Sequence, residues 1–215
     1  MKKVQVVILC GGEGSRVKHI TGAIPKCVFD INGKPFLSYM IDHLSQFNEV
    51  SEFLLCCSDK SLQIAKYLMD YYGFLLESLN KPIRLITEPK PTGTFSGMLS
   101  ALPFVNTKYV LVMNGDTFCP INISDLFQFH KLHRYTRVSV AYSGNVHSGI
   151  WLMHSEYLQA LIELNPRIKR EELLPSGCRI DVPYDECAWI FRYYDAPPFI
   201  DIGTPEGMRE AMEKL

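Results

Sequence analysis

Short apolar runs recur along this 215-residue chain and are separated by longer amphipathic segments. The runs at 4–9 and 109–114 are almost continuously apolar, which is typical of strands buried on both faces of a parallel sheet. Further strands are expected at 51–57, 83–87, 137–142, 149–153 and 189–194.

The segments between these runs show helical periodicity. Helices are expected at 34–47, 61–72, directly after 91–94, and at 124–133, 155–164 and 204–215. In the helix at 61–72, the spacing of Leu62, Ala65, Leu68 and Met69 predicts the buried face.

Three of these helices begin near a hydroxyl side chain. We expect Ser124, Ser155 and Thr204 to be N-caps, because a side-chain oxygen in that position accepts a backbone N–H of the first turn. Pro205 follows Thr204 and suits the first helical position, where no N–H is needed.

The alternation of strands with helices predicts an α/β fold, a Rossmann-like three-layer sandwich around a mostly parallel mixed sheet. One domain over 1–215 accounts for the whole chain, since no repeat or linker composition is evident. Ligands of such folds bind beyond the carboxyl ends of the strands. The residues after the runs at 4–9 and 109–114 are therefore expected to lie close together.

Composition excludes several classes of protein. The net charge is −1, so no general attraction to nucleic acid or to an anionic membrane is implied. No apolar run reaches the roughly 18 residues of a membrane span, and the apolar start at 1–10 is interpreted as a strand rather than a signal peptide. Seven cysteines without a C-x-x-C motif favour reduced thiols and a cytoplasmic location.

A dense glycine loop follows the first predicted strand, in the stretch VILCGGEGSR that ends at Arg16. Glycines in that position let backbone N–H groups approach a phosphate. The loop lacks the lysine of a P-loop, and Val17 stands where the dinucleotide fingerprint has its last glycine. Arg16 and Lys26 flank the loop; each alone is typical of a solvated charge, but together with the loop they favour a polyphosphate.

Five segments in order resemble the sugar-1-phosphate nucleotidylyltransferases. These are ILCGGEGSRV followed by IPKCVFDINGKPFL, then EPKPTGTFSG, VLVMNGDTF, HSGIWLM and FIDIGTPEGMREAM. Each is weak alone, but together they span nearly the whole chain. Within the family, the chain is most similar to guanylyltransferases that act on D-glycero-D-manno-heptose 1-phosphate.

The resemblance implies a nucleotide-diphospho-sugar transferase fold, an NTP and a sugar 1-phosphate as substrates, and Mg²⁺ as cofactor. It implies nucleotide contacts at Cys10, Gly11, Gly12, Gly14, Ser15, Glu88, Gly93 and Thr94. It implies catalytic roles for Arg16, Lys26 and Asp116, metal coordination by Asp116 and Asp201, and sugar contacts at Asn114, Gly115 and Gly149. The reaction needs charge neutralisation and in-line alignment but no protein nucleophile.

The resemblance also places Glu88 against the pairing edge of the base. An ionised carboxylate only accepts hydrogen bonds, and guanine offers two adjacent donors on that edge. Uracil and thymine would set carbonyl oxygens against it, and adenine and cytosine would lose one of the two contacts. We therefore expect GTP to be the preferred donor, the alternative being a glutamate that faces solvent.

The sugar side departs from the family pattern. The F-x-E-K segment, whose lysine binds the sugar phosphate in the family, is missing, and only a tight turn fits between 143 and 147. His147 stands where the family usually has asparagine. Arg192, Lys169 and Arg170 are candidates to replace the missing lysine, although each is more often a surface charge.

This departure leaves other functions open. A pseudoenzyme or regulatory subunit would bind a nucleotide or nucleotide-sugar without catalysis, but it would have less need of both Asp116 and Asp201. A glycosyltransferase of similar fold would want a D-x-D motif, and a dehydrogenase would want the complete fingerprint. A homodimer is also left open, since Trp189 is a candidate exposed aromatic residue.

Overall fold

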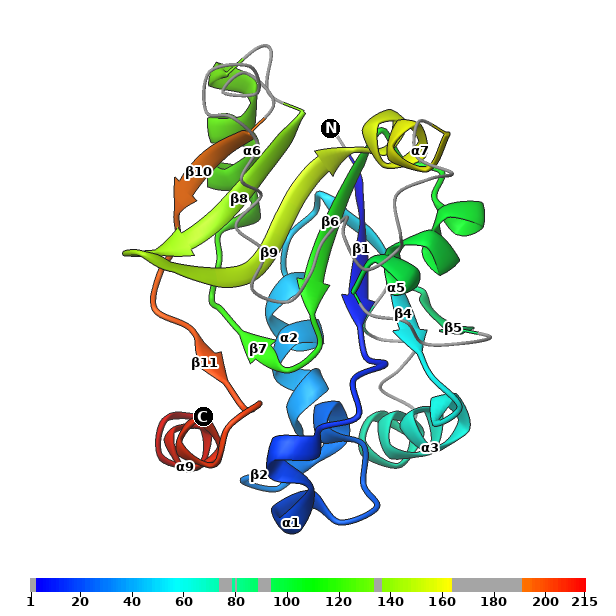
Figure 1. The fold of residues 1–215 in the computed structure, drawn as a ribbon, viewed down its shortest axis with the longest axis vertical. Helices are drawn as coiled ribbons and strands as arrows, with labels where there is room; N and C mark the ends of the chain where they lie inside the picture. Colours follow the sequence, from blue (N-terminus) through cyan, green and yellow to red (C-terminus); the bar gives the residue numbers. More distant parts are fainter. Residues whose placement is uncertain (1–2, 74–78, 80, 89–93, 134–136, 164–190) are drawn as a thin grey trace.

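A seven-stranded sheet forms the centre of the molecule (Figure 1), with strand order β10-β8-β9-β6-β1-β4-β5. The computed structural model describes residues 3–73, 79, 81–88, 94–133, 137–163 and 191–215. The strands are β1 Val4–Leu9, β4 Val50–Cys57, β5 Ile83–Thr87, β6 Tyr109–Asn114, β8 Val138–Ser143, β9 Val146–His154 and β10 Phe191–Asp195. Only β9 runs antiparallel to its neighbours β6 and β8, so the sheet is mixed and mostly parallel, as the sequence predicts.

Helices cover both faces of this sheet and complete a three-layer α/β sandwich (Figure 1). They are α1 Lys18–Thr21, α2 Phe36–Ser45, α3 Ser61–Tyr72, α5 Thr94–Ala101, α6 Ile123–Leu132, α7 Ser155–Glu163 and α9 Pro205–Lys214. Buried side chains of α2, α3 and α6 join one hydrophobic cluster, and those of α5 and α7 join another on the opposite face. The predicted fold class is therefore confirmed.

Two small sheets lie outside the central one. The first pairs β2 Asp30–Ile31 with β3 Lys34–Pro35, and the second pairs β7 Thr117–Phe118 with β11 Ile200–Asp201. The second matters for the site, because it joins the segment after β6 to the segment before α9 (Figure 1).

The predicted buried face of α3 is correct at Leu68 and wrong at Leu62 and Met69. Leu62 is 84% exposed and Met69 is 65% exposed, whereas Ile64, Leu68 and Tyr72 are buried. The buried stripe includes a tyrosine because its hydroxyl donates a hydrogen bond of 2.8 Å to Oδ1 of Asp42. Hydrophobicity alone favoured the wrong positions, since it did not credit a tyrosine whose hydroxyl has a hydrogen-bond partner.

The cap of α6 also differs from the prediction. Asn122 is the N-cap, and its side chain accepts the N–H of Asp125 at 3.2 Å. Ser124 lies inside the first turn, where its hydroxyl donates to Oε1 of Glu49 at 2.6 Å. Asparagine is as strong a cap as serine, and the cap lies two residues earlier than expected.

The other two predicted caps have opposite outcomes. Helix α7 begins at Ser155 itself, whose hydroxyl donates to the carbonyl of Lys108 rather than capping the helix. Thr204 caps α9 as predicted, because its Oγ1 accepts the N–H of Gly207 at 3.1 Å and Pro205 is the first helical residue.

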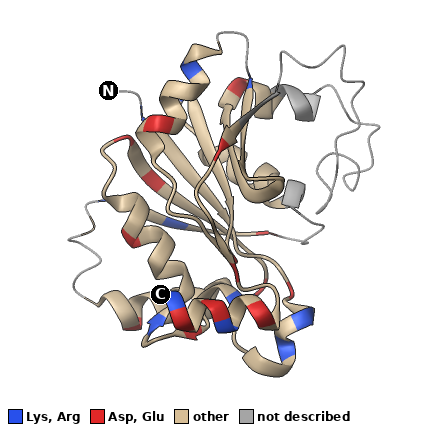
Figure 2. Ribbon diagram, turned by 90° about the vertical axis from the view of Figure 1, so that its left-hand side faces the viewer, with Lys and Arg blue, Asp and Glu red and all other residues tan. Residues whose placement is uncertain are grey.

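The cysteines and the length of the helices test two expectations from the composition. Within the described ranges, the cysteines are buried free thiols at Cys10, Cys27, Cys56, Cys57 and Cys119. No helix among the described residues is long and apolar enough to cross a membrane. Acidic and basic residues are interleaved along α9 (Figure 2), as the near-neutral charge of the chain suggests.

Candidate active site

The glycine loop leaves β1 at the edge of the sheet where β4 and β6 also end. The N–H of Cys10 donates to the carbonyl of Cys56 at 2.7 Å, and the N–H of Gly115 donates to the carbonyl of Leu9 at 3.0 Å. A Cβ atom on Gly115 would lie 2.8 Å from that same carbonyl oxygen. The loop and the end of β6 are therefore in direct backbone contact, as expected from the parallel order of the strands.

Glu88 is buried directly against the glycine loop. It is 5% exposed and follows β5, where its N–H donates to the carbonyl of Cys57 at 2.7 Å. A Cβ atom on Gly11 would lie 2.8 Å from Oε1 of Glu88, and one on Gly97 of α5 would lie 3.3 Å from it. The two glycines thus make the room that this carboxylate occupies, and a solvent-facing glutamate is excluded.

Asp116 and Asp201 are brought together by the small β7–β11 sheet. Asp201 pairs with Thr117 across this sheet, and the N–H of Ile202 donates to the carbonyl of Asp116 at 2.9 Å. Asp116 follows β6 of the central sheet, as expected. Asp201 belongs to β11 outside that sheet, so the meeting of the two carboxylates depends on a separate two-residue ladder.

Two cations lie beside these carboxylates. Nζ of Lys26 forms an ion pair with Oδ2 of Asp116. A Cβ atom on Gly203 would lie 2.8 Å from Oδ1 of Asp201, 3.1 Å from Nη2 of Arg16 and 3.4 Å from Oδ2 of Asp116. Arg16, Asp116 and Asp201 therefore converge around Gly203, and Lys26 joins them through its ion pair with Asp116. The four side chains come from three parts of the chain that are distant in sequence.

The pKa of Asp201 reflects first its burial and then its neighbouring charges. Burial raises the pKa of Asp201, and the negative charge of Asp116 raises it further. The N–H of Gly203, which donates to Oδ1 of Asp201 at 2.7 Å, and the charges of Lys26 and Arg16 act in the opposite direction on that pKa. Two carboxylates that repel each other in a partly buried place are suited to hold a cation between them.

The predicted sugar side lies next to this cluster. Gly149 of β9 has a φ of 71°, and a Cβ atom there would lie 2.5 Å from Nδ2 of Asn114 at the end of β6. Asn114 is two residues before Asp116, so Gly149 and the carboxylates share one end of the sheet. Gly149 is a glycine because a side chain would collide with Asn114.

The other residues predicted for the site have fewer described contacts with the charged cluster around Gly203. Gly12 has open space where a Cβ atom would stand, Gly14 has a φ of 64° and packs on the stem of Lys26, and Ser15 begins a 3-10 turn. Thr94 begins α5, and Arg192 pairs with Ser139 at the outer strand of the sheet. Gly93, Lys169, Arg170 and Trp189 lie outside the described residues.

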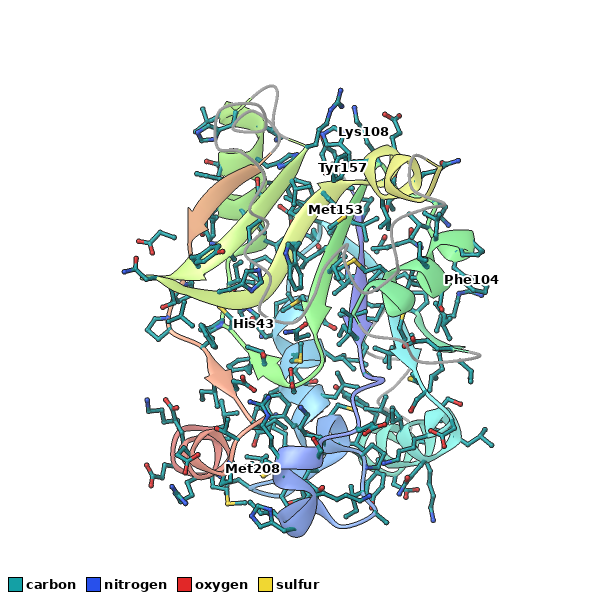
Figure 3. All side chains as sticks on the ribbon, in the orientation of Figure 1. His43, Phe104, Lys108, Met153, Tyr157 and Met208 are labelled. Carbon is teal, nitrogen blue, oxygen red and sulfur yellow. The ribbon has the colours of Figure 1, made fainter. Side chains whose placement is uncertain are left out.

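The prediction from sequence missed Gly97, Gly203 and Gly207. Gly207 in α9 is the tightest of them, because a Cβ atom there would lie 1.7 Å from the carbonyl oxygen of Asp201. Met208, the next residue, is buried on the same helix (Figure 3). The first turn of α9 therefore packs closely against the backbone of Asp201. For Gly203 and Gly207, the only signal in the sequence was their proximity to Asp201 and Thr204.

We expect Gly207→Ala to lower the free energy of unfolding by about 1–3 kcal/mol, because the added methyl group must push α9 away from β11. Urea denaturation of this variant measures the change. Glu213→Ala, at an exposed position of the same helix, is the matched control and should stay within about 0.5 kcal/mol of the wild type. Equal stability of Gly207→Ala and the wild type would contradict the packing described.

Comparison with known families decides the class of this site. The family described as "MobA-like NTP transferase domain" matches residues 6–177. The chain belongs to this family. As an NTP transferase it is a nucleotidyltransferase, and its fold matches those of sugar nucleotidyltransferases.

Similar proteins cover this NTP transferase from end to end. D-glycero-alpha-D-manno-heptose 1-phosphate guanylyltransferase from Campylobacter jejuni is 32% identical, over 94% of this chain and 96% of the relative. The structure of HddC from Yersinia pseudotuberculosis complexed with GMP-PN is 25% identical, with a TM-score of 0.71, covering 98% of this chain and 99% of that one. UDP-glucose pyrophosphorylase from Acinetobacter baumanii, 14% identical with a TM-score of 0.71 over 99% and 92%, shares the fold.

Proposed function

We propose that the chain transfers GMP from GTP to a sugar 1-phosphate, with a heptose 1-phosphate as the favoured acceptor, and releases pyrophosphate. The observation that carries this proposal is the convergence of Arg16, Lys26, Asp116 and Asp201 beside the glycine loop. A heptose 1-phosphate guanylyltransferase at 32% identity over nearly the whole chain supports the choice of substrates.

The proposed step is an in-line displacement at the α-phosphorus. A phosphate oxygen of the sugar 1-phosphate forms a bond to that phosphorus, the bond to the bridging oxygen breaks, and pyrophosphate leaves with the electron pair. Arg16 neutralises charge on the leaving pyrophosphate through its planar fork. Lys26 stabilises the charge that develops on the reacting phosphate.

Asp116 and Asp201 fit a site for Mg²⁺ completed by substrate phosphates. Their donors are hard carboxylate oxygens, and their mutual repulsion is relieved when a cation lies between them. The metal would neutralise phosphate charge and hold phosphate oxygens in the attacking geometry. Lys26 forms an ion pair with Asp116, so its ammonium group lies beside the proposed metal site.

Glu88 is the proposed reader of the base. The burial of Glu88 between Gly11 and Gly97 supports this role, because a buried carboxylate beside the glycine loop could accept N1–H and the amino group of guanine.

We expect Glu88→Gln to reduce the preference for GTP over UTP and dTTP by roughly 10- to 100-fold, because a neutral amide can donate as well as accept. Competition among all the nucleoside triphosphates, with the products separated by chromatography, gives the ratio. Glu213→Gln, at an exposed position of α9, should keep the ratio of the wild type. A wild type that prefers UTP, dTTP, CTP or ATP would show that the carboxylate argument is wrong.

The substrate proposal is tested by a panel of sugar 1-phosphates offered with GTP and Mg²⁺. We expect pyrophosphate release to be fastest with D-glycero-α-D-manno-heptose 1-phosphate and slower with hexose 1-phosphates. Nucleotide binding without pyrophosphate release from any member of the panel would favour a regulatory subunit instead.

A further inference from the structure

Strand β9 is interrupted by a bulge beside the active site. Tyr142 of β8 pairs with His147, whereas the preceding Ala141 pairs with Ile150, so Ser148 and Gly149 are extra residues on β9. Bulges next to active sites commonly redirect a backbone segment toward the ligand. This one directs Gly149 against Asn114, two residues before Asp116.

Two side chains hold the bulge in place. The hydroxyl of Ser148 donates to the carbonyl of Ala141 at 2.8 Å and replaces part of the missing ladder. Nδ1 of His147 accepts the N–H of Gly149 at 2.7 Å. Since Nδ1 is the acceptor, the ring proton of the neutral imidazole lies on Nε2.

The ring of His147 is fixed from both sides. It lies 5.2 Å from the ring of Tyr142 and 4.6 Å from the ring of Trp151, measured between centroids. Burial lowers the pKa of His147, and neither described neighbouring ring is charged at neutral pH. Burial therefore favours the neutral imidazole, and only the neutral ring can accept the N–H of Gly149.

We propose that His147 is a positioning residue that holds Gly149 and, through it, the amide of Asn114 as one wall of the subsite for the acceptor sugar 1-phosphate. The inference rests on the proposed function and adds a residue to it. Because the N–H of Gly149 is already engaged by His147, the polar group offered to a sugar hydroxyl on this wall is the amide of Asn114, which can both donate and accept.

Two substitutions at His147 distinguish the role of its acceptor atom from the role of its ring. Asparagine lacks the ring but can accept the N–H two residues ahead, as in an Asx turn. Phenylalanine keeps a ring between Tyr142 and Trp151 but has no acceptor. If positioning of Gly149 is the role, His147→Asn keeps the function and His147→Phe loses it.

We expect His147→Phe to raise the KM for the sugar 1-phosphate roughly 10- to 100-fold, because a misplaced Asn114 amide leaves a polar group of the bound sugar unpaired. The Kd for GTP should stay within about twofold, and His147→Asn should stay within about threefold of the wild type in both constants. His133→Phe makes the same change at the residue that follows α6, where Nδ1 of His133 lies 2.9 Å from the carbonyl of Phe129, and should alter neither constant. Equal KM values for His147→Phe and the wild type, or equal losses in both His147 variants, would overturn the proposal.

A direct measurement keeps this test separate from that of the proposed function. In the ¹⁵N-labelled wild type, we expect a scalar coupling across the hydrogen bond between the Gly149 nitrogen and Nδ1 of His147. Titration with the sugar 1-phosphate should shift the Gly149 amide signal in the wild type and in His147→Asn, but not in His147→Phe. A wild type that shows this pattern without pyrophosphate release contradicts only the proposed reaction. Absence of the coupling, or no shift of the Gly149 signal in the wild type, overturns the positioning role.

Discussion

Asp116→Asn and Asp201→Asn are each expected to reduce nucleotidyl transfer by at least about 10³-fold while the chain remains folded. Each change removes one of the two carboxylates around Gly203 that fit Mg²⁺. The fold should survive at Asp201 because an amide oxygen can still accept the N–H of Gly203. The charge of Asp116 raises the pKa of Asp201, which shows that the two carboxylates repel each other. Removing one charge relieves this repulsion and so favours the folded state.

Pyrophosphate release measures the loss, and circular dichroism with thermal unfolding verifies the fold. Asp70→Asn on the exposed side of α3 is the matched control and should leave the rate unchanged. Removal of divalent cations with EDTA should reproduce the effect of both active-site variants. Turnover near that of the wild type in either variant would exclude that residue from the metal site.

Lys26→Met is expected to lower kcat by roughly 10²-fold and to change the KM for GTP much less. The side chain of Lys26 is 12% exposed, its stem packs against Gly14, and Nζ is held by Asp116. The ammonium group is therefore preorganised close to where the α-phosphate would react. Such a group contributes more to the transition state than to the bound substrate.

Steady-state kinetics with GTP as the varied substrate separates kcat from KM for this variant. Lys66→Met, on the exposed side of α3, makes the same change away from the site and should match the wild type. A variant at Lys26 that raises KM without lowering kcat would show that the lysine only helps to bind the nucleotide.

Long-range order in this fold follows from simple sequence patterns. The runs that became β1 and β6 are short and almost continuously apolar, and this pattern is sufficient to place them in the middle of a mostly parallel sheet. Their carboxyl ends then meet by topology, which is why the contact of the glycine loop with Gly115 could be predicted. The start of α9 was equally predictable, because Thr204 and Pro205 are strong local signals.

Features that depend on irregular contacts could not be predicted in this way. The β7–β11 ladder has two residues in each strand, too few for any periodic pattern, yet it brings Asp201 to Asp116. The bulge at Ser148 and Gly149 could not be predicted either, because the sequence of this region indicated only a tight turn between the two strands. The family resemblance identified the candidate residues. The structure adds that Gly203, which has no side chain, leaves room for Arg16, Asp116 and Asp201 to meet.

Transfer of a nucleoside monophosphate to a sugar 1-phosphate is tested most directly by following a phosphorus label from GTP into the products in the presence of heptose 1-phosphate and Mg²⁺. We predict that label in the α-phosphate appears in the nucleotide-sugar and label in the γ-phosphate appears in pyrophosphate, with both transfers lost in Asp116→Asn. Release of the γ-label as orthophosphate, or retention of the α-label in GTP, would contradict this prediction.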